Sequence, residues 1–161
     1  MLLAPGAFSY GGVPPLFVYL VDLPLVGALF LHTWLLPFGR GVARALHAAA
    51  FYPDPVPAEY DRTMQAFTLR PEQFRSFASE AKWFGPGLRA MAPRYGEIQR
   101  PLVIVAGAAD HTARPDRHAV PLHQAIAHAK LVMLEGTGHE VHYKHPEAVV
   151  QAVHDAWDFV G

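Results

Sequence analysis

Two residues in the second half of the chain, Asp110 and His139, have the types and the spacing of an acid–base pair. A carboxylate that accepts a hydrogen bond from one imidazole nitrogen fixes the tautomer of the histidine and stabilises its protonated form. The other imidazole nitrogen is then free to take a proton from a nucleophile and to return it later. We therefore predict that Asp110 orients His139 and that His139 is a general base and then a general acid.

The segments around this pair predict two parallel strands joined by a helix. Residues 102–106 form a short apolar run that is rich in β-branched side chains and is followed by Gly107, which indicates a buried strand. A helical segment follows over about residues 116–128, and residues 131–134 form a second apolar run. Such a unit is a right-handed crossover, so both functional residues leave the sheet at the edge where open α/β sheets bind ligands.

Two short motifs carry a resemblance to a known family. The run Gly107–Asp110 (GAAD) resembles the acid loop of the α/β-hydrolase superfamily. The run Gly136–His139 (GTGH), followed by His145–Glu147 (HPE), resembles its histidine loop and the start of its last helix. The resemblance implies a C-terminal portion of that α/β fold, with a short parallel sheet of about three strands, flanking helices and a helical lid. It also implies Asp110 and His139 as the acid and the histidine of the triad.

The rest of the chain is assigned by its place in that fold. Residues 1–9 are expected to form the first core strand and its exit loop, residues 10–95 a helical lid, and residues 96–161 the C-terminal core. Aromatic side chains of the lid are expected to form an apolar wall around substrate. They are Phe30, Trp34, Trp83 and Phe84.

Some helix limits and faces are also predicted. A lid helix is expected to begin near Pro71, which suits a first helical turn, and to end at Gly85-Pro86-Gly87. Asp116 is expected to cap the crossover helix. The closing helix, residues 146–160, is expected to bury one stripe of apolar side chains. The stripe comprises Val149, Val150, Val153, Trp157 and Val160.

The sequence contains no nucleophile elbow. The pattern G-x-S-x-G needs glycine at position 7, which is Ala7, so Ser9 does not fit it. The two other serines, Ser76 and Ser79, lie inside a predicted helix. We therefore expect a fragment of a hydrolase that acts on an ester-like or other C–X bond and lacks turnover by itself. The missing nucleophile is a serine or an aspartate.

A second interpretation is a genuine short protein that binds without catalysis or lies against a membrane. Residues 13–38 are the most apolar part of the chain, but the longest uninterrupted apolar piece, Leu25–Leu31, is too short to span a bilayer. A pair of buried lid helices is the preferred interpretation of this stretch. The codons upstream of Met1 distinguish a truncated gene from a short protein.

Composition restricts the partners. The 161 residues carry 13 Lys and Arg against 14 Asp and Glu, which gives no electrostatic case for nucleic acid. No cysteine is present, so disulfides and thiolate metal sites are excluded. His139, His142 and His145 straddle a loop and a helix start, so we expect no metal and no other cofactor. The implied partner is a small apolar to amphipathic substrate, and a cytoplasmic location is compatible with the sequence, with peripheral membrane association as the alternative.

Overall fold

The computed structural model describes residues 1–9 and 16–158. Within them the chain divides into two compact units, which are described separately. Among the described residues, the sheet unit comprises 1–8, 49–55 and 89–158, and the helical unit comprises 9, 16–48 and 56–88.

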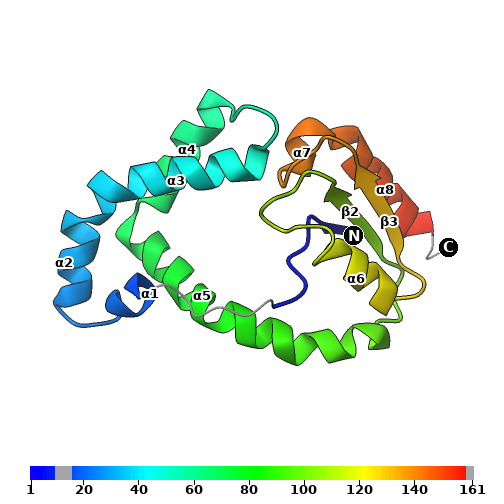
Figure 1. Cartoon of the computed structure of the whole chain (residues 1–161), viewed down its shortest axis with the longest axis horizontal. Helices are drawn as coiled ribbons and strands as arrows, with labels where there is room; N and C mark the ends of the chain where they lie inside the picture. Colours follow the sequence, from blue (N-terminus) through cyan, green and yellow to red (C-terminus); the bar gives the residue numbers. More distant parts are fainter. Residues whose placement is uncertain (10–15, 159–161) are drawn as a thin grey trace. The chain divides into compact units, whose positions relative to one another are not determined.

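A three-stranded parallel sheet forms the centre of the sheet unit (Figure 1). Its strands are β1 (Leu2–Leu3), β2 (Val103–Gly107) and β3 (Lys130–Leu134), in the order β1-β2-β3. Leu2 pairs with Ile104, and Val103 pairs with Lys130. All five residues of β2 are buried, as a β-branched central strand requires. The predicted α/β class with a short parallel sheet is therefore confirmed.

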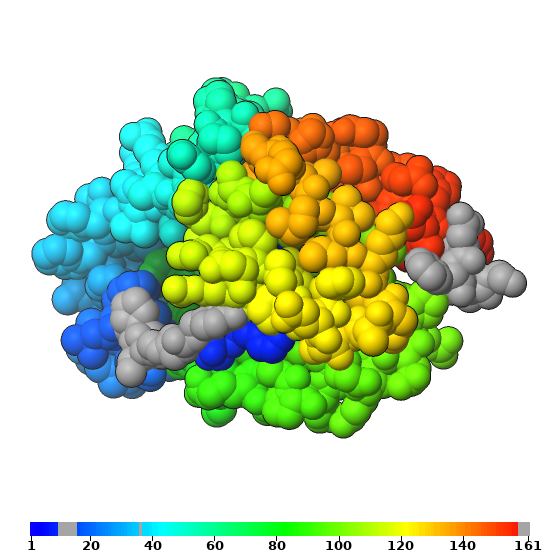
Figure 2. All heavy atoms as spheres, turned by 45° about the vertical axis from the view of Figure 1, so that its right-hand side comes forward, coloured from blue at the N-terminus to red at the C-terminus, as the bar shows by residue number. Residues whose placement is uncertain are grey.

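Helices pack on both faces of this sheet because alternate residues of β2 point to opposite sides. Ile104 and Ala106 belong to one apolar cluster, which includes Leu122 of α6 (Ala119–Ala125). Val103 and Val105 belong to a second cluster, which includes Ala152 of α8 (Pro146–Asp158). On the surface of this unit, the crossover segment (yellow) adjoins the stretch around β3 (light orange) (Figure 2).

Two short helices complete the sheet unit. They are η1 (Ala92–Glu97), a 3₁₀-helix, and α7 (Val141–Lys144). Tyr95 of η1 is buried and donates its hydroxyl hydrogen to the carbonyl of Ala7, and its ring meets that of Phe8 edge-on at 5.4 Å. These contacts fasten the segment after β1 to η1.

The helical unit contains α1 (Phe17–Leu20), α2 (Val26–Thr33), most of α3 (Leu35–Phe51), α4 (Ala58–Thr68) and most of α5 (Pro71–Met91). Its core includes Leu31, Leu35 and Ala78. In α2, Leu31 is 1% exposed but Leu29 is 64% exposed, so the predicted burial of the helices in this stretch is wrong for one face of α2. No helix in residues 16–158 has both the length and the apolar character needed to cross a membrane.

Helix α5 does not end where the sequence predicts. It continues through Pro86 to Met91, so the predicted end at Gly85–Gly87 is wrong. Proline inside a helix removes a backbone donor and crowds the carbonyl four residues earlier, which is why the sequence predicts an end there. Burial of Leu88, which is 8% exposed, favours continuation of the helix beyond Pro86.

Helix α8 faces the sheet differently from the prediction. Val150, Val153 and Trp157 are 56%, 49% and 78% exposed, so the predicted stripe is wrong for these three, and Val160 lies outside the described residues. The buried position is instead Ala152, which is 1% exposed. A small residue lets the helix approach the β2 backbone closely, which a valine or tryptophan stripe would prevent.

Candidate active site

The structure brings Asp110 and His139 together at the carboxyl edge of the sheet. Asp110 follows β2 and His139 follows β3, and the two strands are parallel neighbours. Nδ1 of His139 lies 2.8 Å from Oδ2 of Asp110. The Asp110 side chain is fully buried, whereas 29% of the His139 side chain is exposed. This dyad therefore has a buried acid and an imidazole that solvent reaches.

The second carboxylate oxygen of Asp110 holds the acid loop. Oδ1 accepts hydrogen bonds from the backbone N–H groups of Thr112 at 2.7 Å and Ala113 at 2.8 Å. An aspartate that follows a strand often does no more than close such a turn. Here one oxygen closes the turn and the other binds His139, so the side chain is fixed at both ends.

The electrostatics of the dyad favour the ion pair. Burial alone would raise the pKa of Asp110, but the hydrogen bonds from His139 and from the N–H groups of Ala113 and Thr112 lower it overall. The hydrogen bond to Asp110 raises the pKa of His139 against the effect of burial, and the charges of Asp110 and Glu140 add to this rise. Because Nδ1 donates to the carboxylate, the neutral imidazole has its lone pair on Nε2, where a base needs it.

Backbone contacts fix the acid loop to the histidine loop. The N–H of Ala109 donates to the carbonyl of Thr137 at 2.9 Å, and that of Ala108 donates to Leu134 at 2.9 Å. A Cβ atom at Gly107 would lie 2.2 Å from the carbonyl oxygens of Thr137 and Gly138. The acid motif therefore needs glycine at this position so that the two loops can touch.

The end of α3 and the turn after it support the histidine from another side. The N–H of His139 donates to the carbonyl of Ala50 at 2.8 Å. A Cβ atom at Gly138 would lie 2.1 Å from the carbonyl oxygen of Tyr52, so this glycine also permits a close backbone approach. Sequence reasoning assigned residues 50–52 to the lid and missed this role, because no local motif marks it.

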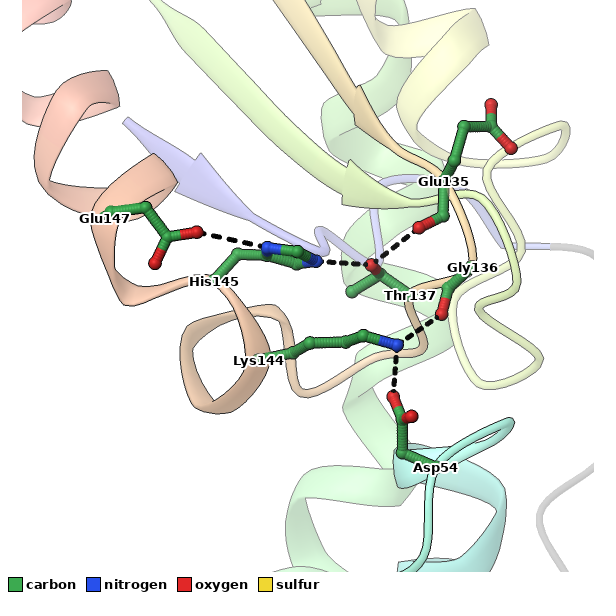
Figure 3. Close-up of polar contacts among 7 residues, drawn as sticks. All are labelled: Asp54, Glu135, Gly136, Thr137, Lys144, His145 and Glu147. Carbon is green, nitrogen blue, oxygen red and sulfur yellow. Dashed lines mark hydrogen bonds and ion pairs between the residues drawn. The ribbon is translucent and has the colours of Figure 1, made fainter.

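Side chains brace the histidine loop further (Figure 3). Lys144 donates from Nζ to the carbonyl of Gly136 at 2.8 Å and to Asp54 at 2.6 Å. Thr137 is buried, and its hydroxyl donates its one hydrogen to the carbonyl of Glu135 at 3.1 Å. The contact at 3.0 Å with Nε2 of His145 is therefore one in which the hydroxyl oxygen accepts.

Nδ1 of His145 in turn lies 3.1 Å from Glu147 (Figure 3). His145 and Glu147 of the HPE run thus support the histidine loop through Thr137. The HPE motif is the sequence feature that indicates this role.

Two further acidic residues, Asp116 and Glu140, form ion pairs with neighbours other than His139. Asp116 pairs with Arg114 at 2.9 Å and its side chain is 58% exposed. It does not cap α6, whose N-cap residue is His118, so that prediction is wrong. Glu140 lies 3.6 Å from Nε2 of His142.

His118, just before α6, is half-buried. Its Nδ1 accepts the backbone N–H groups of Ala7 and Phe8, each at 3.2 Å. Burial lowers the pKa of His118, although the charge of Asp110 opposes this. A neutral His118 therefore ties the segment after β1 to the crossover segment.

The four lid aromatics occupy two kinds of position in the helical unit. Phe30 and Trp34 line an apolar cavity of about 380 Å³ together with Phe74. Trp83 and Phe84 do not line it and are 73% and 60% exposed. In the part of the chain that the structure describes, no group of three or more His, Asp and Glu side chains is arranged to hold a metal ion.

Comparisons with known proteins agree with this architecture. A sequence model described as "Alpha/beta hydrolase family" matches residues 2–152. The structure resembles a bromoperoxidase from Bacillus anthracis, with a TM-score of 0.53 and 13% identity over 77% of this chain and 45% of that one. It also resembles the enol-lactonase from Burkholderia xenovorans LB400, with a TM-score of 0.52 and 20% identity over 97% of this chain and 54% of that one.

The chain thus spans about half the length of these two proteins, and the likeness is one of fold. No curated protein sequence is significantly similar to the chain.

Proposed function

Because this chain belongs to the α/β-hydrolase family, we propose that Asp110 and His139 are the acid and the base of a hydrolytic triad. The observation that carries the proposal is the 2.8 Å contact between Nδ1 of His139 and Oδ2 of Asp110. It leaves Nε2 as the proton acceptor in the neutral imidazole, and the buried carboxylate stabilises the imidazolium that forms during catalysis.

The proposed reaction is hydrolysis of an ester-like or other C–X bond. With a serine nucleophile, Nε2 of His139 takes the hydroxyl proton as the oxygen attacks and gives this proton to the leaving group, which departs and leaves a covalent acyl-serine. His139 then takes a proton from the water that attacks the acyl-serine and returns it to the serine oxygen as the acid product leaves. With an aspartate nucleophile, His139 takes a proton from the water that cleaves the covalent intermediate. No G-x-S-x-G pattern occurs in the 161 residues. In this proposal the nucleophile and the oxyanion hole come from further polypeptide, and these residues alone lack turnover.

The helical unit is proposed to serve as the lid. Its cavity of about 380 Å³, with Phe30 and Trp34 in the wall, suits a small apolar to amphipathic group. Trp83 and Phe84, which line no part of this cavity, remain candidates for substrate contact only through their exposed rings.

The alternative proposal is a binding module without catalysis. The exposed apolar side chains Val150, Val153 and Trp157 on α8 favour it, because an apolar surface of this kind can bind another polypeptide. The two proposals differ in one expected result. A binding module would show no turnover even when a polypeptide with a nucleophile elbow is supplied.

The test is an assay with p-nitrophenyl esters of several acyl lengths. The chain is measured alone and co-expressed with an N-terminal α/β-hydrolase half that carries a G-x-S-x-G elbow. We expect turnover only in the combined protein, with loss of at least a hundredfold in His139→Ala and little change in the matched control His142→Ala, whose side chain is 51% exposed. Turnover by the isolated chain that survived His139→Ala would contradict the proposal.

A further inference from the structure

Four of the thirteen residues that line a second cavity in the helical unit are arginines. This cavity has a volume of about 900 Å³ and takes its walls from α2, α3, α4 and the residues at the start of α5. Two carboxylates, Asp61 and Glu72, also line it, against four guanidinium groups. The four are those of Arg40, Arg44, Arg62 and Arg70.

One of the two carboxylates is already occupied. Asp61 lies 2.7 Å from Nδ1 of His47 and accepts a hydrogen bond from Gln65 at 2.7 Å, and Arg44 approaches it at 3.9 Å. The hydrogen bond from His47 is the main cause of the lowered pKa of Asp61, so this carboxyl is ionised at neutral pH. Asp61 and Glu72 together offset two of the four arginine charges, so two positive charges in the lining have no carboxylate there to balance them.

Those arginines are exposed side chains that line the cavity. The guanidinium of Arg70 lies over the ring of Phe67 at 4.6 Å, a contact that engages the face of the group and does not use its N–H donors. Neither Arg40 nor Arg62 takes part in an ion pair with any described residue. Like charges gathered around a cavity repel one another, and an anion in the cavity removes that repulsion.

The cavity is not wholly polar. Leu31, which is 1% exposed, and Leu69 line it beside the arginines. Leu69 also lines the aromatic cavity. Gly39 leaves space for it, since a Cβ atom there would lie 2.7 Å from Cδ2 of Leu69. Charged donors thus stand next to apolar surface.

We propose that this cavity is a binding site for an organic anion that carries a phosphate or carboxylate group on a short apolar body. Guanidinium groups bind both kinds of oxyanion through paired N–H donors. The apolar body would lie against Leu31 and Leu69. Every residue of the site belongs to the helical unit and none to the Asp110–His139 dyad, so this proposal does not rest on the proposed hydrolysis.

The test is calorimetric titration of the full chain. Octyl phosphate and octanoate, below their micellar concentrations, are compared with octanol, inorganic phosphate and vesicles of anionic phospholipid. We expect both octyl anions to bind at least tenfold more tightly than octanol and than inorganic phosphate. The variant R40Q/R62Q should lose at least tenfold in affinity for octyl phosphate, whereas Arg75→Gln, on α5 and outside the cavity, should retain it.

Three results would overturn the proposal. They are equal binding of octanol and octyl phosphate, equal loss in the Arg75→Gln variant, and binding of the vesicles without binding of the free anions, which would indicate a membrane surface instead. Circular dichroism checks the fold of each variant, and the comparison of octyl phosphate with octanol needs no variant. Octyl phosphate binding should be unchanged in His139→Ala, which separates this site from the dyad.

Discussion

Nδ1 of His139 and Oδ2 of Asp110 are 2.8 Å apart although 29 positions separate the two residues in the sequence. Parallel pairing of β2 with β3 produces this contact, because it places the loops that follow both strands at one edge. The N–H of Ala109 bonded to the carbonyl of Thr137 then holds the two loops together. The acid–base pair is thus a consequence of backbone geometry as much as of the two side chains.

Folding stability should depend on pH through this pair. The pKa of Asp110 is lowered on folding, so its stabilising contribution is present above the pKa of the unfolded state and is lost as the pH falls through the folded value. The pKa of His139 is raised, so its contribution is full below about pH 6.5 and is lost as the pH rises through the folded value.

Urea unfolding from pH 2 to pH 9 measures both effects. We expect the free energy of unfolding to fall at both ends of this range, and the Asp110→Asn variant to show a weaker dependence at each end. Equal pH profiles for the two proteins would show that the pair does not form in solution.

Replacement of Gly107 by alanine should disrupt the contact between the loops. The new Cβ atom would lie 2.2 Å from two carbonyl oxygens, so one loop must move. We expect a loss of about 1–3 kcal/mol in the free energy of unfolding. Gly41→Ala in α3 is the matched control, because nothing lies within 4 Å of its Cβ position and alanine is the better helix former. A Gly107→Ala protein as stable as wild type would contradict the observed packing.

The buried hydroxyl of Thr137 should matter more than the exposed amine of Lys144. Thr137→Val removes the bonds to Glu135 and His145 at a position that is 1% exposed, and we expect it to cost about 1–3 kcal/mol. Lys144→Met removes an exposed ion pair with Asp54 and an exposed hydrogen bond to the carbonyl of Gly136, and we expect it to cost less than about 1 kcal/mol.

Hydrogen exchange of the Ala109 amide tests which of these two side chains supports the histidine loop, because the N–H of Ala109 donates to the carbonyl of Thr137 in that loop. Exchange should speed up in Thr137→Val and change little in Lys144→Met. The reverse order of effects would show that the lysine, and not the buried threonine, fixes the loop.

The sequence predicts the centre of the fold well for a physical reason. Residues 102–106 and 131–134 are short apolar runs that end at glycine or turn residues. Such a run indicates a buried strand from the local sequence alone, without knowledge of distant contacts. The structure has strands at 103–107 and 130–134. Because the acid and the histidine each follow one of these strands, their proximity can be inferred without any knowledge of the side-chain packing.

The parts that could not be predicted depend on contacts between distant segments. The carbonyl of Ala50 supports His139, but nothing near residue 50 in the sequence indicates it. Periodicity shows that α8 is amphipathic, yet it did not reveal that Ala152 rather than Val153 faces the sheet. The pairing of Nδ1 of His118 with two backbone N–H groups likewise requires the segment after β1 to be in place.

An NMR titration of the His139 imidazole, in wild type and in Asp110→Asn, tests the central claim most directly. We predict that His139 titrates above its ordinary value of about 6.5 in wild type, and that its pKa falls in Asp110→Asn because burial then acts without the carboxylate. A wild-type His139 with a pKa at or below 6.5 that the substitution leaves unchanged would contradict the acid–base pair.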